Sequence, residues 1–168
     1  MQLTHYNSKF TPHTFPITLV CENVTNAANI GSLFRTADAF GIEKLIFCGT
    51  PIPFGRKMGQ TSRATEKYVN FAWDENPEEV LKNFKTLGYQ IIALEITDSS
   101  TPLITMDLNT QQPIILLIGD ENFGISEELL ELSNHTVHID MFGQNSSMNV
   151  VQATNIALYE ITKQLREK

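Results

Sequence analysis

The sequence has little of several features that mark common classes of protein. It contains two cysteines, Cys21 and Cys48, and neither belongs to a Cys-x-x-Cys pair. A disulfide framework is therefore excluded, and a reducing, cytoplasmic location is expected. The longest uninterrupted aliphatic run covers only residues 114–118, far short of the roughly 20 residues that span a membrane. Residues 1–15 have neither a basic start nor an apolar core, so no signal peptide is expected.

The motifs of common nucleotide and metal sites are also missing. There is no Walker loop and no Gly-x-Gly-x-x-Gly, which weakens the usual dinucleotide-binding alternatives. Histidine and cysteine lack the spacing of metal ligands, so no metal is predicted. No serine–histidine–acid order is apparent. The histidines lie away from the polar clusters described below; they are His5, His13, His135 and His138.

Positive charge is scarce, and its distribution is uneven. Twelve Lys and Arg stand against 19 Asp and Glu, a net charge of −7, which argues against indiscriminate binding to nucleic acid. One stretch departs from this balance, because only Glu66 opposes its cations, Arg56, Lys57, Arg63 and Lys67. Two interpretations of this stretch stay open. It is either a solvated loop or a local patch for a polyanion.

Apolar, β-rich runs alternate with helical patterns along most of the 168 residues. Strands are predicted over residues 17–21, 44–48, 69–72, 90–96, 113–118 and 137–139. Helices are predicted over residues 29–40, 77–87, 125–132 and 148–165, while proline and glycine predict irregular structure over 49–65. The alternation indicates a single α/β domain over residues 1–168, with a core of about 17–165 and a mostly parallel sheet flanked by helices.

Three polar clusters, residues 26–35, 119–124 and 143–149, follow predicted strands. Ligands bind outside the carboxyl ends of the strands in such sheets, so the clusters predict a site there. Each cluster also has a purely structural interpretation. Asn29 and Ser147 could cap helices, the glycines at 119 and 124 could form a plain turn, and Arg35 could extend from a helix edge into solvent. An arginine directed into a cleft would instead grip a phosphate by its planar fork.

Taken in order, the clusters resemble the three motifs of the SpoU (TrmH-like) branch of the SPOUT RNA methyltransferases. The first is similar to NxGxxxR, with Asn29, Gly31 and Arg35. The second is similar to GxExxG, with Gly119, Glu121 and Gly124. The third is similar to IPMxGxxxSLNVS, with Ile139, Met141, Gly143, Ser147, Asn149 and Val150. The match spans about residues 17–165, and the order of all three motifs makes it specific.

The resemblance implies a parallel sheet with a C-terminal trefoil knot, an obligate homodimer and S-adenosylmethionine as the methyl donor to an RNA ribose 2′-hydroxyl. It implies that the cofactor contacts Leu94, Gly119, Ile139 and Met148. The implied catalytic centre consists of Asn29, Arg35, Glu121, Ser147 and Asn149. An arginine with a pKa above about 12 is a poor base, so we expect Arg35 to clamp a phosphate and to stabilise a developing alkoxide. The group that accepts the proton is left open.

The basic stretch is expected to bind RNA through Arg56, Lys57 and Arg63. Only about fifteen residues precede the first predicted strand, and no separate RNA-binding domain is expected. Such a chain fits tRNA better than rRNA, by analogy. The alternatives are an rRNA methyltransferase, a catalytically silent RNA-binding factor on the same fold, and a nucleotide-binding protein that does not act on RNA.

The sequence departs from the family pattern at a few positions. Asp140 stands where the family usually has proline, Met148 replaces leucine, and Ala27 and Ala28 precede Asn29 where a proline is common. Proline fixes φ and aspartate does not, so Asp140 leaves the shape of the cofactor loop open.

Overall fold

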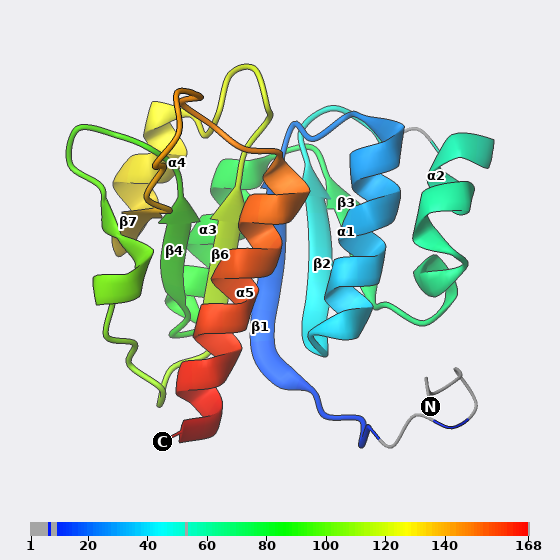
Figure 1. Cartoon of the computed structure of the whole chain (residues 1–168), viewed down its shortest axis with the longest axis horizontal. Helices are drawn as coiled ribbons and strands as arrows, with labels where there is room; N and C mark the ends of the chain where they lie inside the picture. Colours follow the sequence, from blue (N-terminus) through cyan, green and yellow to red (C-terminus); the bar gives the residue numbers. More distant parts are fainter. Residues whose placement is uncertain (1–6, 8–9, 53, 168) are drawn as a thin grey trace.

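The computed structural model describes residues 7, 10–52 and 54–167 (Figure 1). In this part of the chain, seven strands form one sheet in the order β3-β2-β1-β6-β4-β7-β5, and every neighbouring pair is parallel. The strands are β1 (Phe15–Glu22), β2 (Ile42–Cys48), β3 (Phe71–Asp74), β4 (Gln90–Leu94), β5 (Thr101–Pro102), β6 (Ile114–Ile118) and β7 (His135–His138). The α helices are α1 (Ala27–Ala39), α2 (Arg56–Ser62), α3 (Pro77–Thr86), α4 (Glu127–Leu132) and α5 (Val150–Glu167), and two short 3-10 helices are η2 (Thr65–Lys67) and η3 (Leu103–Thr105).

The predicted α/β class with a parallel sheet is confirmed. Every residue of β6 is buried, as expected for a central strand with helices on both faces. One apolar cluster joins the sheet to α1 and α5 through side chains such as Leu33 and Leu158. A second joins the opposite face to α3 and α4 through Leu81 and Leu129. Figure 1 shows α1 and α5 in front of the sheet and α3 behind it.

The helix α2 lies within residues 49–65, so the prediction of irregular structure over that whole stretch is wrong. The helix is short, and among its residues only Met58 and Ser62 are buried. It packs against α1 at Gly31, where a Cβ atom would overlap Thr61 Oγ1 and Met58 O. Contact with α1 stabilises this helix, and local sequence patterns do not report such contacts.

The start of α1 also differs from the prediction. The N-cap is Asn26, whose Oδ1 accepts hydrogen bonds from the backbone N–H groups of Ala28 and Asn29, at 3.0 and 3.2 Å. Asn29 is therefore not the cap. It lies in the first turn of α1, and its side chain is free to take part in the contacts described below.

Candidate functional site

A cavity of about 460 Å³ opens at the carboxyl edge of the sheet, beyond β4, β6 and β7. This volume lies in the range of small-molecule sites. The four residues predicted to contact a cofactor all line it: Leu94, Gly119, Ile139 and Met148. They come from three segments of the chain: Leu94 ends β4, Gly119 follows β6, and Ile139 and Met148 lie in the loop between β7 and α5. The structure thus brings this predicted set together, and what the set binds stays a prediction.

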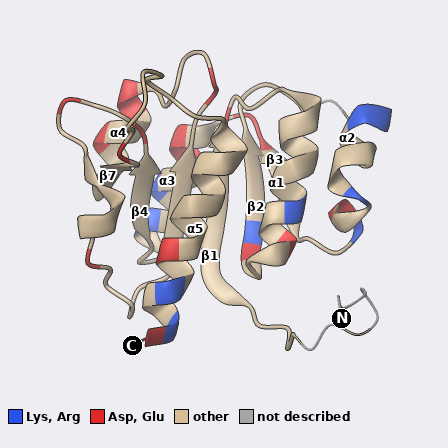
Figure 2. Ribbon diagram, viewed as in Figure 1, with Lys and Arg blue, Asp and Glu red and all other residues tan. Residues whose placement is uncertain are grey.

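The lining of this cavity combines apolar walls with negative charge. Ile118, Ile139 and Met148 supply apolar surface, and the carboxylates are Glu95, Asp120 and Glu121. Among the described residues that line it there is no lysine or arginine. Figure 2 shows Asp and Glu along the loops at this edge. Such a lining favours a ligand with a positive centre and disfavours a phosphate group.

Two carboxylates fix the loop that links β6 to α4. Glu95 Oε2 accepts a hydrogen bond from the backbone N–H of Ile125 at 3.0 Å, and Glu22 Oε2 accepts one from Ser126 at 2.9 Å. Glu22 is buried, and Glu95 lies directly after β4. Neither residue is among those predicted from the sequence. An acidic residue at the end of each of two apolar strands was the pattern that could have indicated them.

Gly119 lines the cavity, and the loop itself leaves no room for a side chain at this position. A Cβ atom at this position would overlap the backbone of Gly124 and Ile125. The close approach that needs glycine is therefore made by the loop to itself, rather than by a ligand. The interpretation of Gly119 as part of a tight turn is therefore supported, and its contact with a cofactor stays a prediction.

Asn149 connects all three polar clusters. Its Nδ2 donates hydrogen bonds to Asn29 Oδ1 at 3.2 Å and to Glu121 Oε1 at 2.8 Å. Its Oδ1 accepts from the backbone N–H of Val151 at 2.9 Å, so Asn149, and not Ser147, caps α5. This capping contact fixes which end of the amide is the donor. Asn149 therefore holds Asn29 and Glu121 in a defined arrangement.

A second, smaller cavity of about 220 Å³ lies beside α1 and includes Asn29. It shares Asp120, Glu121 and Asn122 with the larger cavity. The bridge from Asn149 to Asn29 and Glu121 therefore lies where the two cavities meet. Two reactants held in the two cavities would face each other at this bridge.

The other two predicted catalytic residues, Ser147 and Arg35, lie outside the hydrogen bonds of Asn149. Ser147 lines the larger cavity and is exposed. Arg35 is exposed on α1, two turns beyond the start of the helix. Within the part of the chain that the structure describes, Arg35 forms no ion pair. The structure therefore does not bring Arg35 into the Asn149 network of its own chain.

His138 also lines the larger cavity, so the expectation that all histidines lie away from the clusters is wrong. Its Nδ1 lies 2.9 Å from Ser100 Oγ, and its Nε2 lies 3.5 Å from Asp140 Oδ1. Ser100 Oγ also accepts from Thr97 N and donates to Thr97 O. These bonds hold the serine hydroxyl in the turn, so the group of side chains is a structural link and lacks a free nucleophile.

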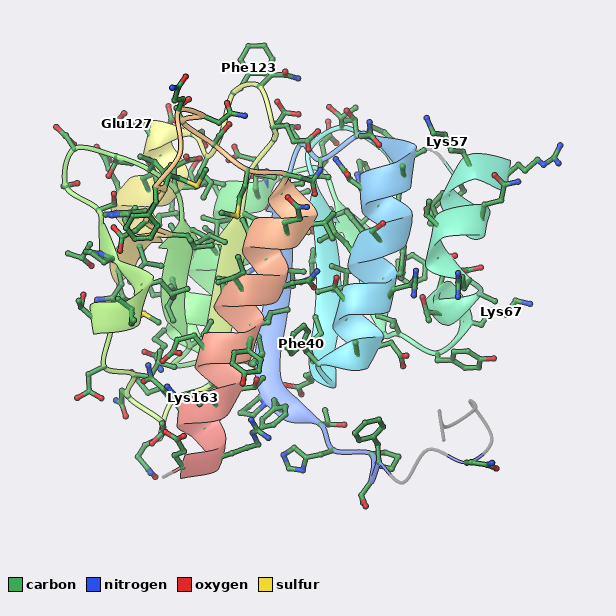
Figure 3. The ribbon with its side chains drawn as sticks, viewed as in Figure 1. Phe40, Lys57, Lys67, Phe123, Glu127 and Lys163 are labelled. Carbon is green, nitrogen blue, oxygen red and sulfur yellow. The ribbon has the colours of Figure 1, made fainter. Side chains whose placement is uncertain are left out.

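The predicted RNA-binding residues lie away from the cavities. Arg56 and Lys57 are exposed in α2, and Arg63 is exposed at its C-cap. Figure 2 shows this cationic segment at the end of the molecule beyond α1, and Figure 3 labels Lys57 and Lys67 there. Glu66 accepts a hydrogen bond from Ser62 Oγ, and this bond lowers the pKa of the Glu66 carboxyl. The arginines and lysines form no ion pair with it in the described chain.

The described residues carry neither a membrane-spanning helix nor a cluster of metal-ligating side chains. No helix there is long and apolar enough to cross a membrane. No group of three or more His, Cys, Asp and Glu side chains there is arranged to hold a metal ion.

Comparisons with known proteins agree on one family. A profile described as the SpoU rRNA Methylase family matches residues 16–159. The tRNA (guanosine(18)-2′-O)-methyltransferase of Aquifex aeolicus is 31% identical over 147 residues, which cover 88% of this chain and 69% of that protein. The same enzyme of Escherichia coli K12 is 27% identical, over 88% of this chain and 63% of its own length.

Solved structures give the same result. The crystal structure of the A. aeolicus TrmH/SpoU tRNA modifying enzyme superposes with a TM-score of 0.83 at 29% identity, over 92% of this chain and 78% of that chain. An AdoMet-bound rRNA methyltransferase from Sinorhizobium meliloti superposes with a TM-score of 0.83 at 26% identity, over 93% of this chain and 59% of that chain.

Proposed function

The chain belongs to the SpoU family and is an RNA 2′-O-methyltransferase, and we propose that it uses S-adenosylmethionine to methylate a ribose of tRNA. The observation that carries this proposal is the acidic cavity beside the Asn149 bridge. The cavity suits the cationic donor, and the adjoining smaller cavity offers a place for the acceptor ribose. The two relatives named as tRNA methyltransferases favour tRNA.

The lining residues fit S-adenosylmethionine. Leu94, Ile139 and Met148 would offer apolar walls to its adenine, and the carboxylates of the lining would stabilise its sulfonium. A homologue crystallised with AdoMet adds support. The lack of lysine and arginine among the described lining residues disfavours ATP or a dinucleotide, which weakens the alternative of a nucleotide-binding protein that does not act on RNA.

When bound, S-adenosylmethionine supplies an electrophilic methyl group, so the residues of the chain mainly need to orient the acceptor hydroxyl. Asn149 fixes Asn29 and Glu121 at the junction of the cavities. This arrangement leaves the Nδ2 donor of Asn29 and the second oxygen of Glu121 for the ribose. Ser147, on the other side of the junction, is proposed to hydrogen-bond the same nucleotide.

Arg35 keeps its proposed role as a phosphate clamp and stabiliser of a developing alkoxide. Because it lies outside the Asn149 network, it must meet the RNA from the exposed face of α1. Arg56, Lys57 and Arg63 are proposed to bind the RNA backbone further from the reaction. Their exposure and lack of ion pairs within the described chain suit this role.

We also propose that the protein is a homodimer formed through α1 and α5. On α5, Ile156 and Tyr159 are 43% and 62% exposed, and a Thr36 Oγ1 to Asn155 Oδ1 hydrogen bond joins the two helices into one surface. An apolar surface of this kind is typical of contact between copies. We further propose that the chain has a C-terminal trefoil knot and that residues 1–168 act as one methyltransferase domain. The proposed location is the cytoplasm.

The test is methylation by the purified chain with radiolabelled S-adenosylmethionine and total RNA from cells that lack the gene. We expect the label in the tRNA fraction, and nuclease digestion followed by mass spectrometry should identify one 2′-O-methylnucleoside. If only rRNA were labelled, the substrate would be rRNA in place of tRNA. Binding of RNA without binding of S-adenosylmethionine, measured by calorimetry, would support a catalytically silent factor.

A further inference from the structure

Two phenylalanines project from the loops that surround the larger cavity. Phe123 lies in the loop between β6 and α4 and is 91% exposed, and Phe142 lies in the loop between β7 and α5 and is 96% exposed. Figure 3 shows the Phe123 ring at the tip of its loop, directed away from the body of the protein. Burial of a phenylalanine is worth roughly 1.5–3 kcal/mol, so a ligand that covered the two rings would gain binding energy. Phe123 lines the cavity, and Phe142 follows Met141, which also lines it.

The neighbours of both rings in the sequence are mostly polar, with Met141 as the apolar exception directly before Phe142. Asp120, Glu121 and Asn122 precede Phe123, and Gly143, Gln144 and Asn145 follow Phe142. A surface for another protein is usually a continuous apolar patch, and the exposed apolar side chains already proposed for such a contact are Ile156 and Tyr159 on α5. Exposed single rings on a mostly polar surface are instead typical of proteins that stack unpaired bases.

The charge of this edge points to the same ligand. The rim carries Glu95, Asp120 and Glu121, and among its described lining residues it has no lysine or arginine. Phosphates would be repelled there, so an RNA that reaches the Asn149 bridge must gain affinity from something other than charge. Aromatic faces bind bases without requiring positive charge, at about 1–3 kcal/mol per base.

We propose that Phe123 and Phe142 stack on unpaired bases that flank the methylated nucleotide, so that the substrate is a single-stranded RNA loop. This inference rests on the proposed function. Base-paired RNA would be excluded, because its bases are stacked on each other and their faces are covered. The two rings would thus select an exposed loop, while α2 binds phosphates whatever the sequence.

The chain offers a matched control in Phe10, which is 92% exposed and precedes the amino end of β1, whereas the cavity lies at the carboxyl ends of the strands. The variants are Phe123→Ala, Phe142→Ala, the double variant and Phe10→Ala. Phe123→Trp keeps a ring, and Phe123→Leu keeps apolar volume without one. Thermal unfolding and calorimetry with S-adenosylmethionine check that the fold and the donor site are retained.

The readout is fluorescence anisotropy with two RNA probes of equal charge, a 12-nucleotide oligoadenylate and a 12-nucleotide abasic ribose-phosphate chain. We expect the wild type to prefer the oligoadenylate by about fivefold or more. Phe123→Ala and Phe142→Ala should each reduce this preference, and the double variant should abolish it. Phe10→Ala and Phe123→Trp should keep it, and Phe123→Leu should lose most of it.

Equal binding of both probes by the wild type, or an unchanged preference in the double variant, would overturn the proposal. So would sedimentation showing that the alanine variants break a dimer, because the rings would then contact a second copy. The methylation assay separates this from the proposed function. If the wild type preferred oligoadenylate but transferred no methyl group to tRNA, the proposed function would fail. The stacking proposal would still stand.

Discussion

The carboxyl edge of the sheet and the α2 segment differ in charge, in hydrogen bonding and in the way the sequence specifies them. At the edge, Asn149, Asn29 and Glu121 restrain one another, and the surrounding rim is acidic. In the α2 segment, Arg56, Lys57 and Arg63 are exposed and unpaired within the described chain. A site that orients reactants needs fixed groups, whereas a site that attracts a polyanion needs free positive charge. The net charge of −7 conceals this division.

The largest effect should come from Asn149→Ala, which removes the bridge between the clusters. Release of Asn29 and Glu121 should lower the single-turnover methylation rate by about 100-fold, because small losses of alignment have effects of that size. The lost cap of α5 should also cost about 1 kcal/mol of the free energy of unfolding. Rapid-quench assays and chemical denaturation measure the two quantities.

Two further variants separate alignment from capping. Asn149→Asp keeps an oxygen for the cap and loses the Nδ2 donor, so it should retain stability and still lose the rate. Asn145→Ala removes an exposed amide from the same loop and should change neither. Full activity of Asn149→Asp would show that the bridge does not orient the site.

The next effect concerns Arg35, which belongs to neither region. Arg35→Ala should lower the rate at saturating RNA by about 10- to 100-fold with little change in affinity for S-adenosylmethionine. Arg35→Lys should restore little of it, since lysine keeps the charge and lacks the planar fork. If Arg35→Ala instead weakened only RNA binding, Arg35 would belong with the α2 cations.

Neutralising Arg56, Lys57 and Arg63 together to glutamine should weaken RNA binding and leave the saturating rate nearly unchanged. The slope of log affinity against log salt concentration should become shallower by about 0.7 for each lost phosphate contact. Titrations at several salt concentrations measure it. Lys82→Gln and Lys85→Gln on α3, on the opposite side of the sheet, provide the control for loss of positive charge elsewhere. Equal effects per removed charge from both sets would mean that net charge, and not this segment, governs binding.

The two regions also differ in how far the sequence predicts them. The three motifs and most strands are visible because each is encoded within a few consecutive residues, and the structure brings Leu94, Gly119, Ile139 and Met148 to one cavity. The helix α2 was missed because its stability depends on contact with Gly31, about 30 residues earlier.

Two other features at the carboxyl edge of the sheet were not predicted, because they depend on contacts or backbone geometry that consecutive residues do not reveal. Glu22 and Ser126 form a hydrogen bond across 104 positions of the chain, and no local pattern reports such a pair. The choice of Asn26 over Asn29 as the cap of α1 depends on the extended backbone of Asn26, at φ −67° and ψ 116°. Both asparagines are equally good caps by composition.

The smallest effect should come from Asp140, where the family usually has proline. Its carboxylate lies 3.5 Å from His138 Nε2, and the Asp140 side chain is 45% exposed, so solvent screens the pair and its removal should change stability by less than about 1 kcal/mol. Asp140→Asn should therefore leave affinity for S-adenosylmethionine within about twofold, as measured by calorimetry.

Asp98→Asn, on the neighbouring loop and also exposed, is the control because it removes an equal charge that has no contact with His138. Equal losses of affinity in both variants would show that the acidic edge acts as a general field around the cavity. A loss in Asp140→Asn alone would show that the link from Asp140 through His138 to Ser100 shapes the loop, in place of the φ restriction that proline supplies in the relatives.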